Sequence, residues 1–569
     1  MLGIHIIDWL VLFAYLVGVT IIGVMAANKV KNTVDFFLGG RQFRKTFMLF
    51  YSFGSGTHSD QAVSVARKTY TNGLSGIWYQ WLWLFCTPFY WTIAPIFRRM
   101  RALTTGDYFN MRYGHSVAAL YAGICILQLV VNIATMLKGS GAMITASTGG
   151  AFSEFWAIAI LTVLFVVYGI AGGLRAAILT DFIQGILTIF LSFLVLPFAL
   201  HLVGGISGLK DTIADPAMFS LVAPGEITAF YIAVIAFNGL IGIVTQPHIM
   251  SCCAAGLTEM DNRVGFCYGN MLKRFCTVAW TITGLCAIAL YPGLTSDAQI
   301  DQTYGLMARD ILPTIAPGLL GLFIASILAA VMSSCDAWMI SSSALFTENV
   351  YKPYVAPTKS QAHYVFIGRV TAGLIILGSV AFALSLDSVI EGLETFWKIQ
   401  AMMGIAFWIG LFWRRATPAA AWACTLSAFF VLLVTSNKLS FIFDMNAFAV
   451  NYLPAVTVYD GEFRLPFQML SYLSVGAIVM VAVSLMTKRA DETKLNQLYR
   501  CLNTPVQDGE NPTEPFELPE NSQPEQRTKI INHPDWEFYV PTKTDTYGFL
   551  FAWIWVAALI GGVYYFLAS

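Results

Sequence analysis

The feature that most constrains this chain is a series of apolar runs, each about twenty residues long, that recurs along its whole length. The hydrocarbon core of a bilayer is about 30 Å thick, and an α-helix needs roughly 20 residues to cross it. By that measure the sequence predicts fourteen membrane-spanning helices. Their expected limits are 5–27, 47–67, 76–97, 117–147, 153–171, 178–203, 226–250, 274–292, 317–347, 364–385, 390–412, 417–436, 467–487 and 546–567.

Composition excludes the soluble alternative. Of the 569 residues, 57% are hydrophobic and 12% are charged, whereas soluble domains carry about 25% charged residues. The 33 basic and 33 acidic residues cancel, so no basic excess predicts a nucleic-acid partner. The ten cysteines form no Cys-x-x-Cys pair, and we expect buried thiols that behave as small hydrophobes. The predicted fold class is an all-α polytopic membrane protein with the lipid bilayer as its surroundings.

Basic residues predict the orientation of the helices. They cluster in the loops after the odd-numbered spans, which the positive-inside rule assigns to the cytoplasm. Fourteen helices then place both termini outside, in a plasma or inner membrane. Residues 488–545 are polar and Pro-rich, and we expect a partly ordered cytoplasmic tether. The bases counted in these loops include Lys29, Lys31, Arg41, Arg98, Arg99, Arg101, Arg112, Lys273, Arg274, Arg414 and Arg415.

The second span is unusually polar. It contains Gly54, Gly56, Thr57, His58, Asp60 and Gln61 where a spanning helix would carry leucine. Membranes tolerate unwound backbone only where it lines a cavity, and free carbonyls in such a stretch bind hard cations. The alternative is that the small residues only allow close helix packing. That alternative explains the glycines but not the three larger polar side chains, so a functional site is predicted here.

The ninth span carries a second polar group. The hydroxyls of Ser333 and Ser334, together with the carbonyl of Ala330, offer oxygen-only ligands of the kind that Na⁺ prefers. Serine can instead bond to its own helix, and we favour that interpretation for residues 341–343. Asp336 follows two residues later.

Three further polar positions have alternative explanations. Asp181 in the sixth span is either part of a site or an interfacial helix cap. Lys138 either reaches the interface or pairs with a carboxylate. His58 and His248 lack the partner spacing of a zinc site. No catalytic constellation is evident, so the sequence does not predict an enzyme.

Four ordered motifs make the chain resemble the sodium/solute symporter family. The first is Asp35-Phe36-Phe37-Leu38-Gly39-Gly40-Arg41, and the last is Leu411-Phe412-Trp413-Arg414-Arg415-Ala416-Thr417. Between them lie the stretch from Tyr168 to Arg175 with Thr180-Asp181-Phe182-Ile183-Gln184, and the stretch from Ala329 to Ser334. The resemblance covers about residues 5–490.

The resemblance implies a leucine-transporter-like fold with two inverted five-helix repeats. The implied division is 1–46 (first helix and cytoplasmic loop), 47–204 (repeat one), 205–416 (repeat two), 417–487 (peripheral helices), 488–545 (cytoplasmic linker) and 546–569 (last helix). It also implies a sodium-coupled symporter that imports a small polar solute, sugar-like or carboxylate-bearing, by alternating access. A channel or sensor that derives from such a transporter is the alternative, and no obligate protein partner is evident.

The resemblance also implies the site residues. The Na⁺ ligands map to carbonyls of Gly54, Thr57 and Ala330 and to hydroxyls of Ser333 and Ser334. A second Na⁺ would use Asp181, Ser333 and Asp336, although a proton shared by the two acids remains an alternative. The solute residues map to Gly56, His58, Asp60, Gln61, Tyr79, Gln80, Asn238 and Gln400. Gly56 and Gln80 depart from the sugar transporters' pattern, whereas His58 would suit a carboxylate.

Overall fold

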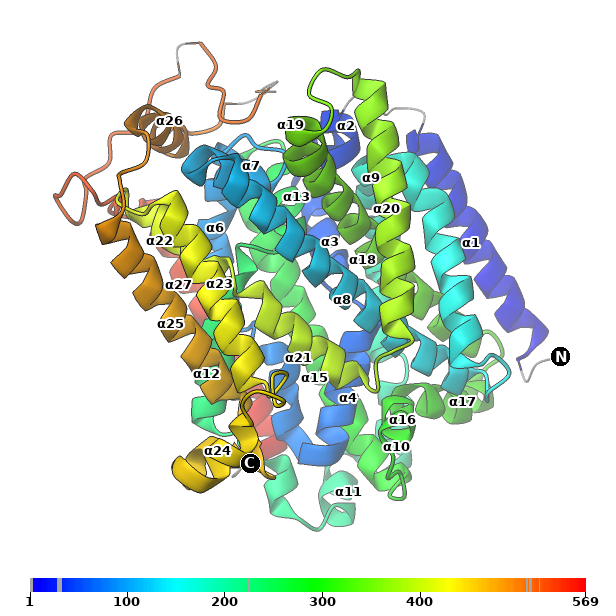
Figure 1. Cartoon of the computed structure of the whole chain (residues 1–569). Helices are drawn as coiled ribbons and strands as arrows, with labels where there is room; N and C mark the ends of the chain where they lie inside the picture. Colours follow the sequence, from blue (N-terminus) through cyan, green and yellow to red (C-terminus); the bar gives the residue numbers. More distant parts are fainter. Residues whose placement is uncertain are drawn as a thin grey trace.

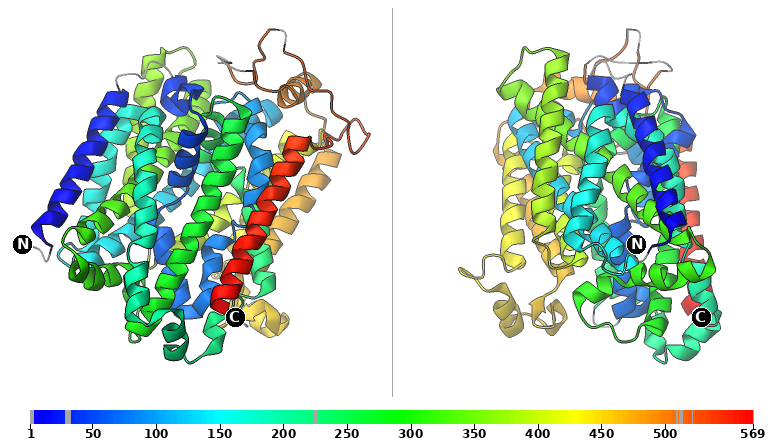
Figure 2. Two further views of the ribbon diagram at one scale, coloured as in Figure 1. Left: turned by 180° about the vertical axis from the view of Figure 1, so that it is seen from behind. Right: turned by 90° about the vertical axis from the view of Figure 1, so that its right-hand side faces the viewer.

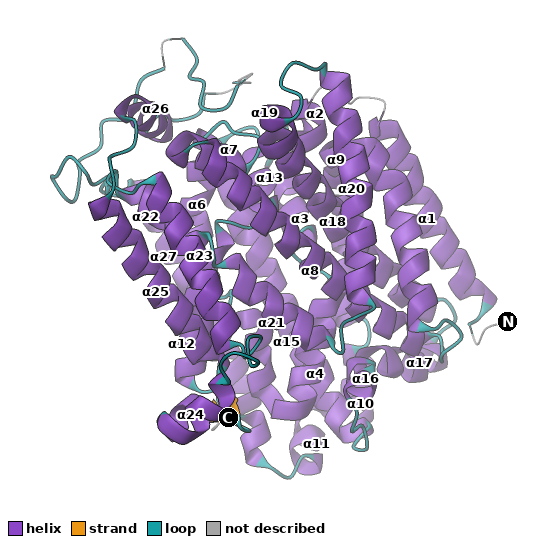
Figure 3. Cartoon of the chain, in the orientation of Figure 1, coloured by secondary structure: helices purple, strands orange, loops and turns teal. Residues whose placement is uncertain are grey.

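The computed structural model describes residues 4–27, 33–223, 226–507, 510, 514–520 and 522–568. The described chain is a bundle of tilted helices, most of them roughly parallel to one direction (Figure 1). A single two-stranded hairpin, β1 (Val458–Tyr459) with β2 (Glu462–Phe463), is the only sheet among the described residues (Figure 3). The predicted all-α class is therefore confirmed.

The helices of the bundle follow the predicted apolar runs. Within the described residues, nine helices are long and apolar enough to cross a membrane, and one bent pair would make ten. The count of fourteen therefore stays a prediction. The bundle helices are α1 (Ile6–Ala27), α3 (Lys45–Gly54), α4 (Ser59–Asn72), α5 (Trp78–Trp81), α6 (Thr87–Arg99), α8 (His115–Ser147), α9 (Glu154–Phe193), α12 (Ala229–Ile243), α13 (His248–Ala254), α15 (Gly269–Leu290), α18 (Leu319–Phe346), α20 (Gln361–Ala383), α21 (Val389–Gln400), α22 (Gly404–Phe412), α23 (Pro418–Thr435), α25 (Leu465–Met486) and α27 (Lys543–Val563).

Shorter helices lie at the two ends of the bundle. One end carries the linker 488–545 with α26, and we call it the tether face; the opposite end carries α11, α16 and α24 (Figure 1). Both termini lie away from the tether face in each view (Figure 2). Which face is outside stays a prediction. The shorter helices are α2 (Thr33–Leu38), α7 (Thr105–Tyr113), α10 (Leu196–Leu202), α11 (Gly205–Thr212), α14 (Glu259–Arg263), α16 (Asp297–Asp301), α17 (Thr303–Ile315), α19 (Lys352–Tyr354), α24 (Met445–Tyr452) and α26 (Glu492–Leu502).

Two spans are broken near their middles. The second predicted span consists of α3 and α4, separated by the non-helical residues 55–58. The seventh consists of α12 and α13, whose axes are bent by 71° around residues 244–247. The unwound stretch expected in the second span is thus present, and a second break lies five spans later in the chain.

The fifth predicted span and most of the sixth lie within α9, and the sixth ends in α10 (Leu196–Leu202). The first turn of α9 reaches the end of α8, because Glu154 pairs with Lys138 at 2.9 Å. Its last turn reaches the same end of the molecule, since the Tyr304 hydroxyl donates to the Leu191 carbonyl at 3.0 Å and a Cβ on the neighbouring Gly305 would lie 2.6 Å from the Met143 carbonyl of α8. The two halves of α9 therefore cross the molecule in opposite directions, as two spans must.

The eighth span differs from its prediction. The helix runs without interruption from Glu259, through a π-helical turn at Val264–Tyr268, to Leu290. Lys273 and Arg274, which we expected in a cytoplasmic loop, are buried inside α15. Their charges are tolerated there because both side chains donate hydrogen bonds to backbone carbonyls. Lys273 donates to the Gly56 carbonyl, and Arg274 donates to the Gln80 carbonyl. Of the other predicted loop bases, Lys29 and Lys31 lie outside the described residues.

Candidate functional site

The break between α3 and α4 lies against α18. The carbonyl of Gly54, the last residue of α3, accepts hydrogen bonds from the hydroxyls of Ser333 at 3.3 Å and Ser334 at 3.0 Å. Ser333 also lies 3.3 Å from the Ala330 carbonyl. The Thr57 amide donates to the same Gly54 carbonyl at 3.1 Å, and the Thr57 hydroxyl is buried without a hydrogen-bond partner among the described residues. The Gly54 and Ala330 carbonyls and the two serine hydroxyls thus lie close together, and whether they bind sodium stays a prediction.

Two buried carboxylates lie beside these oxygens. The Asp181 side chain of α9 lies 3.5 Å from the position that a Cβ on Gly54 would occupy, and it is close enough to Asp336 for the two charges to interact. Both carboxylate oxygens of Asp181 are buried and accept no hydrogen bond from the described residues. Lys138 does not lie between these acids, because it pairs with Glu154. A cation or a proton would relieve the repulsion between the two acids.

A small polar cavity lies between the two broken spans, and we call it the central cavity. It has a volume of about 50 Å³, enough for one or two waters. Both breaks, α15, α18 and α21 contribute to its walls. Its polar lining residues are Ser52, Gly56, His58, Gln61, Gln80, Asn132, Gln246, His248, Asn270, Lys273 and Arg274, and its aromatic ones are Trp83, Tyr90, Phe266, Trp338, Phe396 and Trp397.

Several polar atoms on these walls lack a hydrogen-bond partner among the described residues. They include both amide atoms of Gln80 and of Asn132, the Gln61 amide oxygen, the Ser52 hydroxyl and His248 Nδ1. Gln80 and Asn132 are each 1% exposed. Leaving a buried polar group unpaired costs about 1–3 kcal/mol, so native proteins rarely gather such groups in one place without water, an ion or a ligand to satisfy them.

The predicted solute residues divide into two groups. Gly56, His58, Gln61 and Gln80 line the central cavity. The other four lie behind its walls and are held by neighbouring groups: Asp60 by His58, Asn238 by Tyr472 and the Trp397 carbonyl, Gln400 by Gln246, and Tyr79 by Glu394. Whether any of them contacts a solute stays a prediction.

Lys273, Asn132, Gln246 and His248 line the cavity but were not predicted as solute residues. Lys273 was missed because its basic neighbour Arg274 made the pair resemble a loop. Asn132 is an isolated amide within an apolar helix, which by itself is no signal. Gln246-Pro247-His248 could have been found, since a proline between two polar residues inside a span indicates a break.

Larger cavities flank the central one on both sides. Toward the face that carries α24, a polar cavity of about 520 Å³ is lined by Lys68, Tyr79 and Glu394 among others. Here the Tyr79 hydroxyl donates to Glu394 at 3.0 Å, and the Tyr79 ring lies against Trp397, with 5.3 Å between ring centroids. Trp397 also lines the central cavity, so this aromatic pair separates the two spaces.

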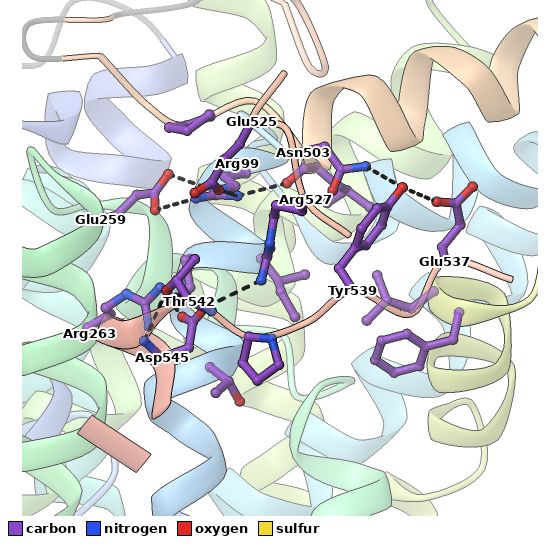
Figure 4. A pocket seen from close by; sticks show the side chains of 18 of the residues that line it. Arg99, Glu259, Arg263, Asn503, Glu525, Arg527, Glu537, Tyr539, Thr542 and Asp545 are labelled. Carbon is purple, nitrogen blue, oxygen red and sulfur yellow. Dashed lines mark hydrogen bonds and ion pairs between the residues drawn. The ribbon is translucent and has the colours of Figure 1, made fainter. Parts of the chain in front are cut away.

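Toward the tether face, a cavity of about 770 Å³ extends from Phe89, Leu240 and Trp408 to the tether. Charged side chains of the tether and of α6 and α14 form its roof (Figure 4). Larger spaces thus lie on both sides of the central cavity, which itself is nearly closed in this structure.

Two discontinuous helices, a central polar cavity and an oxygen cluster beside it define a secondary transporter rather than an enzyme. The sequence model of the sodium:solute symporter family matches residues 36–428, and the chain belongs to that family. It is therefore a multi-pass membrane protein, a sodium-coupled solute symporter, with Na⁺ as its coupling ion.

Individual relatives are distant. The chain is 25% identical to the high-affinity proline transporter PutP of Bacillus subtilis, over 75% of this chain and 92% of the relative. It is 23% identical to the sodium/glucose cotransporter of Vibrio parahaemolyticus, over 74% of this chain and 83% of that relative. A Na⁺-coupled sialic acid symporter in a substrate-bound outward-open state superimposes with a TM-score of 0.69 at 18% identity, covering 85% of this chain and 99% of the other. That similarity confirms the predicted leucine-transporter-like fold.

Proposed function

We propose that this protein couples Na⁺ entry to the import of a small polyhydroxylated solute, and that the solute bears an acidic group. The observation that supports this proposal is the set of unpaired amide and imidazole atoms on the walls of the central cavity. Amides present donors and acceptors side by side, which matches hydroxyl groups that both donate and accept. The tryptophan walls offer apolar faces for the C–H surface of a sugar-like ring.

The charge on the walls favours an anionic solute. Among the residues that the structure describes, no carboxylate lines the central cavity, so an amine or amino-acid ammonium would find no counter-ion there. Lys273 and Arg274 bring positive charge, and the Lys273 ammonium donates to the carbonyl of Gly56 in the first break, which also accepts from the Gln61 amide. A solute carboxylate at this point would pair with Lys273.

Sodium would bind beside this cavity. The proposed ligands are the carbonyls of Gly54, Thr57 and Ala330 and the hydroxyls of Ser333 and Ser334. The hydroxyls donate to Gly54 in this structure, and a bound cation would turn their lone pairs toward itself. A second ion near Asp181, Ser333 and Asp336 would offset the charge of the two acids, and we propose Na⁺ as its occupant with a shared proton as the alternative.

The proposed direction of transport follows from the two faces. The tether face carries the arginines of α6 and α7 and those that follow α22, so we assign it to the cytoplasm and place both termini outside, in the plasma or inner membrane. The solute would enter from the cavity of about 520 Å³ and leave into the one of about 770 Å³. The central cavity must widen for this passage, as alternating access requires.

A ligand panel tests the proposed solute. The melting temperature of the purified protein is measured with neutral sugars, sugar acids and amino acids, each in Na⁺ and in K⁺. We expect a sugar acid to raise it most, and only in Na⁺. Lys273→Gln should remove the preference for the acid over the matching neutral sugar. Stabilisation by amino acids alone would contradict the proposal.

Uptake into proteoliposomes tests the sodium ligands. Ser333→Ala with Ser334→Ala removes two of about five oxygen ligands, so the Na⁺ concentration for half-maximal uptake should rise more than tenfold. Ser341→Ala with Ser342→Ala is the matched control, because those hydroxyls donate to carbonyls of their own helix. Equal Na⁺ dependence in both variants would contradict the assigned ligands. Solute movement that never exceeds its gradient would indicate the channel alternative.

A further inference from the structure

Trp338 lies between the proposed sodium site and the central cavity. It belongs to α18, one helical turn beyond Ser334, and is 2% exposed. Its indole N–H donates to the Ser55 carbonyl at 3.0 Å. Ser55 is the first residue of the break and directly follows Gly54, whose carbonyl meets the two serine hydroxyls. The indole is thus attached to the peptide next to the proposed sodium ligand.

The same ring contacts the second break. His248, the first residue of α13, stacks on the indole with 4.9 Å between ring centroids and 20° between ring planes. Phe396 of α21 is also nearly parallel to the indole, at 6.1 Å and 28°. His58, from the first break, meets the indole edge to face at 5.5 Å. One side chain therefore contacts both discontinuous helices and a wall of the cavity.

We propose that Trp338 is a positioning residue that transmits sodium binding at the first break to the second break, and so shapes the solute cavity. This inference rests on the proposed sodium site. A cation bound by the Gly54 carbonyl fixes that peptide and with it the Ser55 carbonyl. The hydrogen bond then holds the indole, and the indole holds His248 and the start of α13 through their stacked rings. Two sites joined by such a contact affect each other's affinity reciprocally.

Hydrogen exchange on the full chain in lipid nanodiscs tests the proposal, with Na⁺ as the probe and K⁺ as the reference. In the wild type, Na⁺ should slow amide exchange in peptides that cover residues 54–61 and also in those that cover 248–256. In Trp338→Phe, which keeps a ring but loses the N–H donor, the first effect should persist. The second should fall by about fivefold or more, the lower end of usual coupling between sites.

Two comparisons separate this role from a general loss of packing. Trp280→Phe is the matched control, since Trp280 is also buried and its indole donates at 3.0 Å to the Ser192 hydroxyl, away from both breaks. It should leave both Na⁺ effects unchanged. His248→Ala should abolish the effect on residues 248–256, whereas His248→Phe should retain it. These two variants also test the proposal if Trp338→Phe does not fold.

The outcomes distinguish the inference from the proposed sodium site. If Na⁺ does not slow exchange at residues 54–61 of the wild type, the sodium site itself is refuted. If that effect is present but exchange at residues 248–256 of the wild type does not change with Na⁺, Trp338 does not transmit sodium binding. The same conclusion follows if Na⁺ slows exchange there as much in Trp338→Phe and His248→Ala as in the wild type. A loss of both effects in Trp338→Phe, with Trp280→Phe normal, would make Trp338 a support of the sodium site and overturn the proposed coupling.

Discussion

The central cavity and the roof of the tether-face cavity both contain buried polar side chains, but among the described residues these side chains have partners in the roof, whereas several in the central cavity lack one. In the roof, Arg99 and Arg263 each pair with a carboxylate, and Arg101 and Arg414, which do not line this cavity, pair with Glu510 and Glu537 of the tether. Arg99, for example, donates to both carboxylate oxygens of Glu259, at 2.7 and 3.0 Å (Figure 4). In the central cavity, by contrast, the amides of Gln80 and Asn132 meet no partner among the described residues.

Whether a buried polar group has a partner distinguishes residues that stabilise the fold from residues that can bind a ligand, and it does so better than polarity or cavity size. The tether-face cavity is about 770 Å³ and the central one about 50 Å³, yet the arginines of the larger one are engaged in holding the tether to the bundle. Buried groups that satisfy one another stabilise a fold, whereas buried groups left unsatisfied are available to a ligand. Each prediction below changes one member of this contrast.

The largest effect on stability should come from the pair formed by Arg101 and Glu510. The Arg101 side chain is fully buried and Glu510 is 2% exposed. Burial acts to lower the pKa of Arg101, but the hydrogen bond and charge of Glu510, together with the contribution of Cys501, raise that pKa above its ordinary value, so the guanidinium stays charged. Arg101→Met leaves one buried charge alone and should lower the free energy of unfolding by about 3–5 kcal/mol. Thermal unfolding in detergent measures the loss.

The double variant Arg101→Met with Glu510→Met is the control for that prediction. Because it leaves no lone charge, it should recover most of the lost stability. If the single and double variants unfold at the same temperature, the pair does not hold the tether as described.

A smaller effect, of opposite sign, is expected in the central cavity. Gln80→Leu removes two unpaired buried polar atoms, so it should leave stability unchanged or raise it by about 1 kcal/mol. Uptake of the solute found in the ligand panel should nevertheless fall more than tenfold, because the amide would bind that solute. Melting temperature and initial uptake rate, measured on the same preparation, check both halves.

Asn238→Leu is the matched amide for this test. Asn238 donates to the Trp397 carbonyl at 2.9 Å and accepts from Tyr472 at 2.6 Å. Asn238→Leu leaves those two groups buried without this hydrogen-bond partner, which should lower the free energy of unfolding by about 1–3 kcal/mol. A stability loss in Gln80→Leu as large as in Asn238→Leu would remove the distinction between the two amides.

The sequence was sufficient for the fold class and for locating the polar break beside the ninth span, whereas the sodium ligands stay a prediction. Spans are long apolar runs, and Gly54, Ser333 and Ser334 are small polar residues where leucine is expected, so both signals are local. The residues that line the solute cavity carry no such local signal, because they are far apart in the chain. Gln80 lines the cavity while the adjacent Tyr79 does not, because helix geometry turns successive side chains in different directions. Lys273 was misplaced because its burial depends on the Gly56 carbonyl, 217 residues away in the chain.

The smallest effect should come from an exposed pair of the tether. Arg489 donates to both oxygens of Asp535, at 2.7 and 3.0 Å, and this hydrogen bonding lowers the pKa of the Asp535 carboxyl below its usual value. A lowered folded-state pKa stabilises the protein above the ordinary aspartate pKa of about 3.9, and the contribution is lost as the pH falls through the folded-state value.

Arg489→Ala should therefore lower the melting temperature slightly at pH 7, far less than Arg101→Met does, and leave uptake unchanged. Wild type and variant should converge as the pH falls below the ordinary value of about 3.9 and through the lowered folded-state pKa of Asp535, because the carboxylate is then protonated in both. Added salt should also shrink their difference, because exposed charges are screened. A difference as large as that of Arg101→Met, or one that persists in acid, would show that this exposed pair holds the tether as firmly as the buried one.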